Sequence, residues 1–372
     1  MKTIERDGLQ YEIVTTPVDT LAYVVGASEE IDKVFIPSEI DGVPVKSVSH
    51  GAFKHMNSIT DVVFDEGIES IQFSAFQFCK SLRSVYLPKT LTSIGTSAFA
   101  QCYNLINVTT HEGLQYIYNQ AFSECMISTF HFPNSLTYIG KEAFYNTWLH
   151  DITFGKNLVH IDDRAFRSCE LLETVKFSEN VKEIGDCAFA DCIKLKNITF
   201  SDSLKYLSSD VVDGCNVLES VHLGKDTRLD GHGITFAFEC ESLRDFTVSP
   251  ENKNYTVVDG VLYDKTIKRL IKIPSSLEKN KILIPSWVES VACNSFENIK
   301  NIKVIDFDSK EIKNIEYSGI HNFPKIKIRC HSDSQLQKAL KDCGINTFPI
   351  NSELTVFLNS NLENPDILKG GF

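Results

Sequence analysis

Cysteine and histidine are the side chains of widest chemical use in this sequence, which holds 11 and 10 of them. A zinc site or a disulfide framework would favour close pairs such as C-x-x-C, which do not occur, or an even cysteine count. Instead, several cysteines recur at one position of a repeated segment, namely Cys79, Cys102, Cys125, Cys169 and Cys192. A thiol placed so regularly behaves as a small buried apolar group. The spacing therefore predicts a structural column, and it leaves disulfides between neighbouring repeats open.

No common catalytic or nucleotide-binding motif is present, because H-E-x-x-H, G-x-S-x-G, G-x-G-x-x-G and the phosphate-binding loop are all missing. A small acidic cluster of Asp306, Asp308 and Glu311 offers the oxygen ligands that calcium prefers. Lys310 and the missing loop glycine break the calcium-loop pattern, so we interpret this cluster as a solvated turn. The sequence predicts no enzyme, no metal site and no cofactor.

An Ala-Phe dipeptide lies three residues before these cysteines and recurs every 22 or 23 residues. Its regular copies are Ala52-Phe53, Ala75-Phe76, Ala98-Phe99, Ala121-Phe122, Ala143-Phe144, Ala165-Phe166 and Ala188-Phe189. The same position then holds Val211-Val212, Ala237-Phe238 after a longer interval, and Ser295-Phe296 beyond an insertion. These copies predict ten repeats.

Each repeat also contains an alternating segment, which is typical of a β-strand. Its inward residues are predicted to be Val85/Leu87, Phe130/Phe132, Ile152/Phe154, Val175/Phe177, Ile198/Phe200 and Val221/Leu223. A second short apolar pair follows a turn, as in Leu91/Ile94 and Leu136/Ile139. One repeat cannot enclose its own apolar side chains, so the repeats must stack as coils of a solenoid, with parallel strands about 4.8 Å apart.

Two of the repeats, "LTSIGTSAFAQCYNLINVT" and "VKEIGDCAFADCIKLKNITF", resemble the BspA-like, Treponema-type leucine-rich repeats, and the resemblance extends over about residues 45 to 310. It implies a mainly β leucine-rich-repeat solenoid with right-handed coils of 22–23 residues. Stacked short parallel strands, short helical or irregular turns and a cap at each end complete the expected fold. The segment from Glu251 to Pro274 resembles the hairpin that commonly interrupts such arrays.

The chain is expected to divide into five parts. They are an N-terminal cap (1–45), the leucine-rich repeat array (46–248), a hairpin insertion (249–285), the last repeats (286–330) and a C-terminal cap helix with a tail (331–372). In the last part, Ser334 to Cys343 is predicted to form the helix. Both caps would shield the open ends of the core.

Candidate binding residues lie at the exposed positions of the coils, because the repeated motif residues are predicted to be buried. One column contains Tyr116, Tyr138, His160 and Tyr206, and a column on the other strands contains Tyr86, His131, Lys176 and His222. Exposed aromatic rings in a line are unusual unless they stack on each other or on a ligand such as a peptide or a sugar. Both interpretations stay open for Tyr116, Tyr138 and His160.

The formal net charge of −12 disfavours nucleic acids and anionic membranes as partners. No apolar run reaches the roughly 18 residues of a membrane span, and no signal peptide is visible. We therefore expect a non-catalytic protein-binding or adhesion module with a protein or glycan partner. The family resemblance implies a cell-surface or secreted location, as its members are typically attachment proteins of bacteria and protists. The alternative is a cytoplasmic scaffold, which the many unpaired thiols favour.

Overall fold

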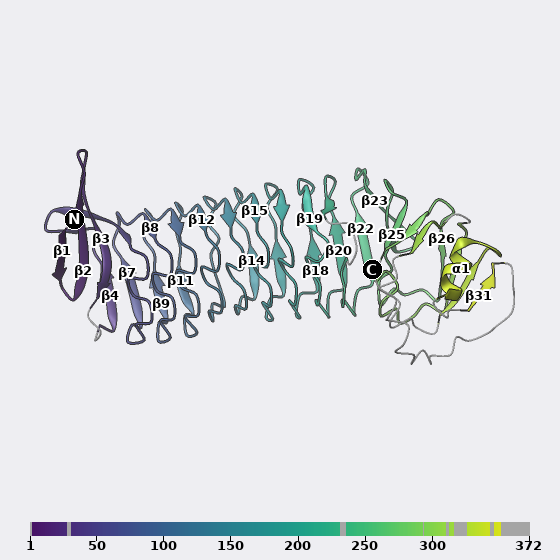
Figure 1. Ribbon diagram of the computed structural model, residues 1–372, viewed down its shortest axis with the longest axis horizontal. Coiled ribbons are helices and arrows are strands. Elements are labelled where there is room, and N and C mark those ends of the chain that lie inside the picture. Colours follow the sequence, from purple (N-terminus) through teal and green to yellow (C-terminus); the bar gives the residue numbers. More distant parts are fainter. Residues whose placement is uncertain are drawn as a thin grey trace.

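The coils of this chain stack into an elongated solenoid of about 13 turns, mainly β and with almost no helix (Figure 1). The computed structural model describes residues 2–27, 31–230, 236–292, 294–309, 312–315, 326–342 and 346–350. The ten repeats predicted from the dipeptide are fewer than the turns observed. The coil that contains strands β3 and β4, for example, carries no Ala-Phe pair and was predicted as part of the N-terminal cap.

One side of the solenoid is formed by a 13-stranded sheet, called here the long sheet. Its strands are β1 (Lys2–Arg6), β2 (Leu9–Thr15), β3 (Thr20–Ala27), β5 (Glu39–Ile40), β6 (Val43–Val48), β8 (Ser70–Ile71), β10 (Ser93–Ile94), β12 (Tyr116–Ile117), β13 (Tyr138–Ile139), β15 (His160–Ile161), β17 (Glu183–Ile184), β19 (Tyr206–Ser208) and β21 (Arg228–Asp230). Within this sheet, the successive neighbours β6, β8, β10, β12, β13, β15, β17, β19 and β21 pair in parallel and in register. At the N-terminal end β1, β2 and β3 form an antiparallel meander that extends beyond the coils.

The second side, called here the short-strand side, carries three smaller parallel sheets in sequence along the axis. They contain β4 (Lys33–Ile36), β7 (Asp61–Phe64), β9 (Ser84–Tyr86) and β11 (Asn107–Thr109), then β14 (Asp151–Thr153) and β16 (Thr174–Lys176), then β18 (Asn197–Thr199), β20 (Ser220–Leu223) and β22 (Asp245–Val248). The predicted inward residues of these segments are buried, apart from the partly buried Phe177.

The C-terminal part begins with an antiparallel hairpin and continues the two-sided stack. One sheet contains β23 (Tyr255–Val258), β24 (Val261–Asp264), β25 (Arg269–Lys272), β27 (Ser290–Val291) and β29 (Asn314–Ile315); the other contains β26 (Lys281–Ile284), β28 (Val304–Phe307), β30 (Lys327–Cys330) and β31 (Thr347–Pro349). Helix α1 (Gln335–Asp342) confirms the predicted helix, and Ser334 Oγ caps it by accepting the amide of Gln337 at 3.1 Å. A separate apolar cluster fills this part.

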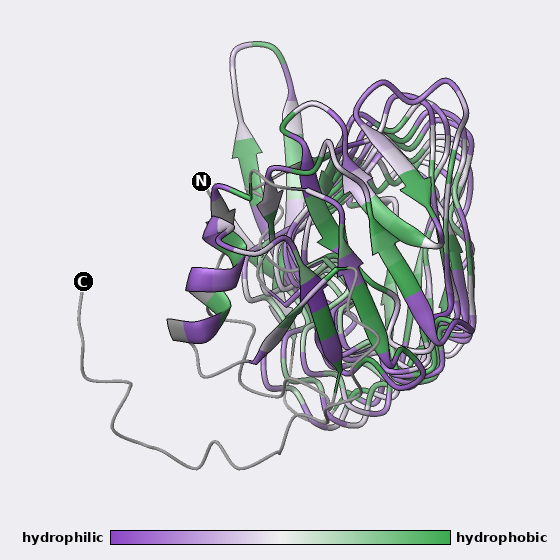
Figure 2. Ribbon diagram, turned by 90° about the vertical axis from the view of Figure 1, so that its right-hand side faces the viewer, coloured by the Kyte–Doolittle hydropathy of each residue, from purple (hydrophilic) through white to green (hydrophobic). Residues whose placement is uncertain are grey.

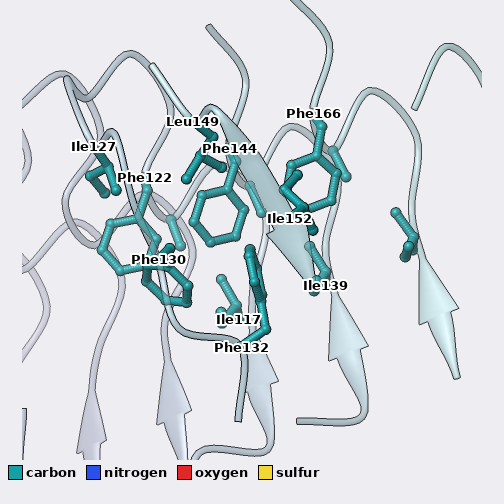
Figure 3. Packing of buried hydrophobic residues seen from close by; sticks show 14 of the residues in the cluster. Ile117, Phe122, Ile127, Phe130, Phe132, Ile139, Phe144, Leu149, Ile152 and Phe166 are labelled. Carbon is teal, nitrogen blue, oxygen red and sulfur yellow. The ribbon is translucent and has the colours of Figure 1, made fainter. Parts of the chain in front are cut away.

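The phenylalanines of successive repeats form a ladder through the interior of the solenoid. The end-on view shows the coils superposed around this interior (Figure 2). From Phe53 to Phe189, successive ring centroids lie 4.7 to 5.4 Å apart, close to the spacing of stacked strands. Only the Phe122–Phe144 pair is tilted, by 24°. Phe130 packs edge-on against both of those rings (Figure 3).

The cysteines form the structural column that the sequence predicts. Each thiol donates to the main-chain carbonyl of the residue in the phenylalanine position one coil earlier, in the pairs Cys79–Phe53, Cys102–Phe76, Cys125–Phe99, Cys169–Phe144, Cys192–Phe166, Cys215–Phe189 and Cys240–Val212, at 3.0 to 3.4 Å. Thr147 replaces cysteine in one coil, and its hydroxyl donates to Phe144 O at 3.0 Å. Burial raises the pKa of Cys169 to about 11. The column is made of free thiols in all these coils.

The prediction of Ala237-Phe238 as a repeat dipeptide is wrong by one residue. Cys240 keeps the thiol bond of its column. In the other coils the phenylalanine lies three residues before the cysteine, so the dipeptide positions of this coil are held by Phe236 and Ala237. Phe236 is 1% exposed, whereas Phe238 is only partly buried. The cysteine spacing, rather than the dipeptide, therefore sets the register of this coil.

Candidate binding surface

The eight predicted binding residues lie on two different sides of the solenoid. Tyr116, Tyr138, His160 and Tyr206 belong to the long sheet, where Tyr116 pairs with Tyr138, Tyr138 with His160, His160 with Glu183 and Glu183 with Tyr206. Tyr86, Lys176 and His222 are on the short-strand side, and His131 lies in the corresponding segment of its coil. The structure keeps these two sets apart, so they cannot form one site.

Four rings on the long sheet form a continuous group, called here the aromatic cluster: Tyr116, Tyr118, Tyr138 and His160. The Tyr116 and Tyr118 centroids lie 5.9 Å apart with a 12° interplanar angle, and the Tyr118 and Tyr138 centroids lie 6.2 Å apart at 52°. Tyr138 stacks on His160 at 5.4 Å and 8°. The rings of three consecutive coils are thus joined by direct contacts.

Tyr118 was not among the predicted residues, although it links the tyrosines on both sides. It lies two residues after Tyr116, so an alternating strand points both side chains the same way. The neighbouring coils carry Gly95 and Gly140 at the position of Tyr118, and comparing one column at a time hid the exception. The signal that could have found it was the i, i+2 tyrosine pair within a single coil.

Two carboxylates hold the rings of the aromatic cluster in place. The Tyr138 hydroxyl donates to Asp162 Oδ2 at 2.8 Å, and His160 Nδ1 lies 3.0 Å from Glu183 Oε2. Burial, followed by the hydrogen bond to Asp162, raises the pKa of Tyr138 to about 12. Asp162 was also missed in the sequence, because its position is glycine in the coils before and after it. The cluster is therefore fixed in shape before any partner arrives.

The two interpretations of these rings apply to different members of the cluster. Tyr138 and His160 cover each other's faces, which is the mutual stacking that stiffens the sheet. Tyr116 and Tyr118 remain 38% and 40% exposed. Tyr206 is 52% exposed and has no ring contact among the described residues. Surface available to a partner is concentrated at Tyr116, Tyr118 and Tyr206.

A second exposed apolar group lies at the N-terminal end of the short-strand side. Phe35, Val63 and Tyr86 are register neighbours on β4, β7 and β9, and they are 56%, 38% and 49% exposed. Further along, the outward column is polar, with His222 Nδ1 2.8 Å from Thr247 Oγ1. Phe35 escaped the sequence analysis because its coil lacks the dipeptide that defines the repeat.

Several carboxylates accept hydrogen bonds from main-chain amides in the turns between coils. Glu112 accepts the amides of Asn134 and Ser135, both at 3.0 Å, from the following coil. The bond from the Asn134 amide is the largest effect that lowers the pKa of Glu112. Glu66 accepts the amide of Lys89 at 3.0 Å in the same way. These carboxylates bind amides of the following coil and so join successive coils, which makes them structural groups.

The interpretation of Asp306 as part of a solvated turn is wrong. Asp306 lies in β28 and is 4% exposed. Lys281 Nζ of β26 lies 2.9 Å from Asp306 Oδ2, and Arg329 Nε of β30 donates to Asp306 Oδ1 at 2.5 Å. Two cations on adjacent strands neutralise this carboxylate, because an unpaired buried charge would be costly. Glu311, from the same predicted cluster, lies outside the described residues.

Within the described ranges, no group of three or more His, Cys, Asp or Glu side chains is arranged to hold a metal ion. None of the helices in that part of the chain has the length and apolar character to cross a membrane.

Comparison with known families agrees with this architecture. The model of the BspA type leucine-rich repeat region, which comprises six copies of the repeat, matches residues 46–173, 159–281 and 275–368. The chain belongs to the BspA-type leucine-rich repeat family. The matched segments cover the second apolar cluster, the first one from Val48 onward, and all four members of the aromatic cluster.

Solved leucine-rich repeat proteins share the fold of this BspA-type chain. A leucine-rich repeat protein from Bacteroides ovatus aligns with 23% identity and a TM-score of 0.56, covering 88% of this chain and 94% of that one. A leucine rich cell surface protein from Faecalibacterium prausnitzii aligns with 18% identity and a TM-score of 0.53, covering 88% and 76%. No curated protein matches the chain significantly.

Proposed function

We propose that this BspA-type protein is a non-catalytic module that binds another protein, and that the exposed part of the aromatic cluster contributes the central contact. The observation that carries the proposal is the unbroken line of ring contacts from Tyr116 to His160, fixed by Asp162 and Glu183. Rigid, partly exposed tyrosines contribute large contact areas at low entropic cost, which is why they are common in protein interfaces.

Attachment at a bacterial cell surface is the setting that we propose for this binding. The F. prausnitzii protein that shares the fold is described as a leucine rich cell surface protein. A scaffold inside the cell is the second candidate, and the nine described cysteines, all free, favour it. Protease treatment of intact cells separates the two, since a surface module is digested and an intracellular scaffold is protected.

The binding proposal is tested by replacing Tyr116 and Tyr138 with serine in one variant. We expect partner capture to fall to background while the coils stay folded, with a modest loss of stability because the Tyr138 hydroxyl no longer bonds Asp162. Tyr86→Ser is the matched control, since Tyr86 is 49% exposed on the other side of the solenoid. A variant that melts earlier yet captures the same partners at the same level would show that the rings only stiffen the sheet.

A further inference from the structure

We propose that the aromatic cluster binds a cationic side chain, the guanidinium or ammonium group of a basic segment on the partner. This inference rests on the proposed function, because it names the chemistry that the partner brings to the same surface. Three features carry it: the exposed part of the Tyr118 ring, the carboxylates beside Tyr138, and the hydrogen bonds that Tyr138 and His160 already make.

Space beside Tyr118 is built into the backbone. A Cβ atom added at Gly95 would lie 2.7 Å from the carbonyl oxygen of Ile71, and one at Gly140 would lie 2.7 Å from the amide nitrogen of Asn119. Both contacts are too close for a real side chain, so the coils on either side of Tyr118 have to be bare at this position. The Tyr118 ring consequently stands between two glycines and stays 40% exposed.

Negative charge is concentrated on the C-terminal side of the cluster. Asp162 bonds the Tyr138 hydroxyl, Asp163 also acts on Tyr138 electrostatically, and Glu183 lies against His160. The same turns carry Lys141, Arg164 and Lys182, of which Arg164 is 3.6 Å from Glu142, which offsets its charge. A cation over a tyrosine face is attracted by the ring, and adjacent carboxylates add to that attraction.

The charges and the hydrogen bonds within the cluster argue against an anionic ligand and against a sugar. An anionic segment would meet Asp162, Asp163 and Glu183 and be repelled. A sugar would find fewer free hydrogen-bonding groups at Tyr138 and His160, because the Tyr138 hydroxyl is bound to Asp162 and His160 Nδ1 contacts Glu183. The formal net charge of −12 further favours a basic partner.

Fluorescein-labelled tetra-arginine, added to the full chain at low ionic strength, tests the inference by fluorescence anisotropy. We expect saturable binding that Tyr118→Leu weakens at least about fivefold and that Tyr118→Phe retains, because phenylalanine keeps the ring face that a cation needs. The Asp162→Asn/Glu183→Gln double variant should also weaken binding, while tetra-glutamate and maltoheptaose should not bind.

Two controls separate a site from general attraction to an acidic protein. Tyr103→Leu removes an exposed ring outside the cluster and outside the candidate surface, and Glu241→Gln/Glu251→Gln removes two charges from remote exposed positions. Both should leave the affinity within about twofold of the unchanged chain. Equal losses in test and control variants, or unchanged binding in Tyr118→Leu, overturn the inference. Partner capture that survives in Tyr118→Leu would leave the proposed function standing and remove only the cationic ligand.

Discussion

The thiols of the cysteine column do structural work at the scale of single residues. Each one fills a small buried space and supplies a weak donor to a carbonyl of the preceding coil. Thr147 shows that a hydroxyl can occupy the same position, although it donates to the Phe144 carbonyl of its own coil and not to the coil before it. The chain thus contains its own example of the substitution that the column tolerates.

Replacing Cys102 by alanine should lower stability by about 2 kcal/mol, through the lost bond to Phe76 and the cavity that remains. Cys102→Thr should cost less, because it restores both volume and a donor. Urea denaturation monitored by circular dichroism measures both variants. If threonine proves as harmful as alanine, the thiol bond is not what the position requires.

Asp213 is a half-buried carboxylate, and its partial burial raises its pKa from 3.8 to about 8. Since the folded pKa lies above the unfolded value, the contribution of this group is fully present below pH 3.8 and is lost as pH rises through about 8. Asp213→Asn keeps the oxygen that accepts the Phe238 amide at 2.9 Å. Thermal melts should show the variant gaining stability over the unchanged chain between about pH 4 and about pH 9. A constant difference across that range would contradict the raised pKa.

At the scale of elements, the ends of the two sides are protected differently. The outer strand β1 carries Lys2, Glu5 and Arg6 at exposed positions, and such charges discourage pairing with another chain. Strand β4 has no pairing partner on its outer edge among the described residues, and its outward Phe35 is 56% exposed. The outer edge of β4, on the short-strand side, is therefore more prone to self-association than the outer edge of β1 on the long sheet.

Phe35→Lys should reduce light scattering of concentrated solutions and leave the melting temperature nearly unchanged, since the ring contributes little to the core. Static light scattering over a concentration series measures the first quantity. Tyr86→Lys is the control, because Tyr86 lies in the same column but two strands away from the edge. Equal effects of both variants would assign the behaviour to the apolar surface as a whole.

The elements also show what the sequence could reveal. The dipeptide and the cysteines predicted the strands, their inward residues and the thiol column, because these positions are constrained by stacking in every coil. Tyr118, Asp162 and Phe35 were missed because each is an exception at its position or lies in a coil without the dipeptide. The register at Phe236 was predicted wrongly for a related reason, because it was taken from the dipeptide alone and not from the dipeptide together with the cysteine spacing.

For the whole molecule, each coil is stabilised mainly by its two neighbours. Phe122→Ala should cost about 3 to 5 kcal/mol and act locally, because the ring packs on Phe99 and Phe144. Hydrogen exchange followed by mass spectrometry should show faster exchange in the adjacent coils. The sheet from β26 to β30, which belongs to the second apolar cluster, should exchange as before. Acceleration along the entire chain would indicate a single cooperative unit instead.

The thiol column also determines how the protein meets oxidants. Eight of the nine described free cysteines are buried, and burial with the hydrogen bond to Asp210 raises the pKa of the half-buried Cys187 to about 12. Because only a thiolate reacts readily, these thiols are inert while the coils are closed, even outside the cell. Buried free thiols can consequently persist at a cell surface as well, although free thiols in general favour the reducing interior of the cell. Their alkylation would record, coil by coil, when the solenoid opens.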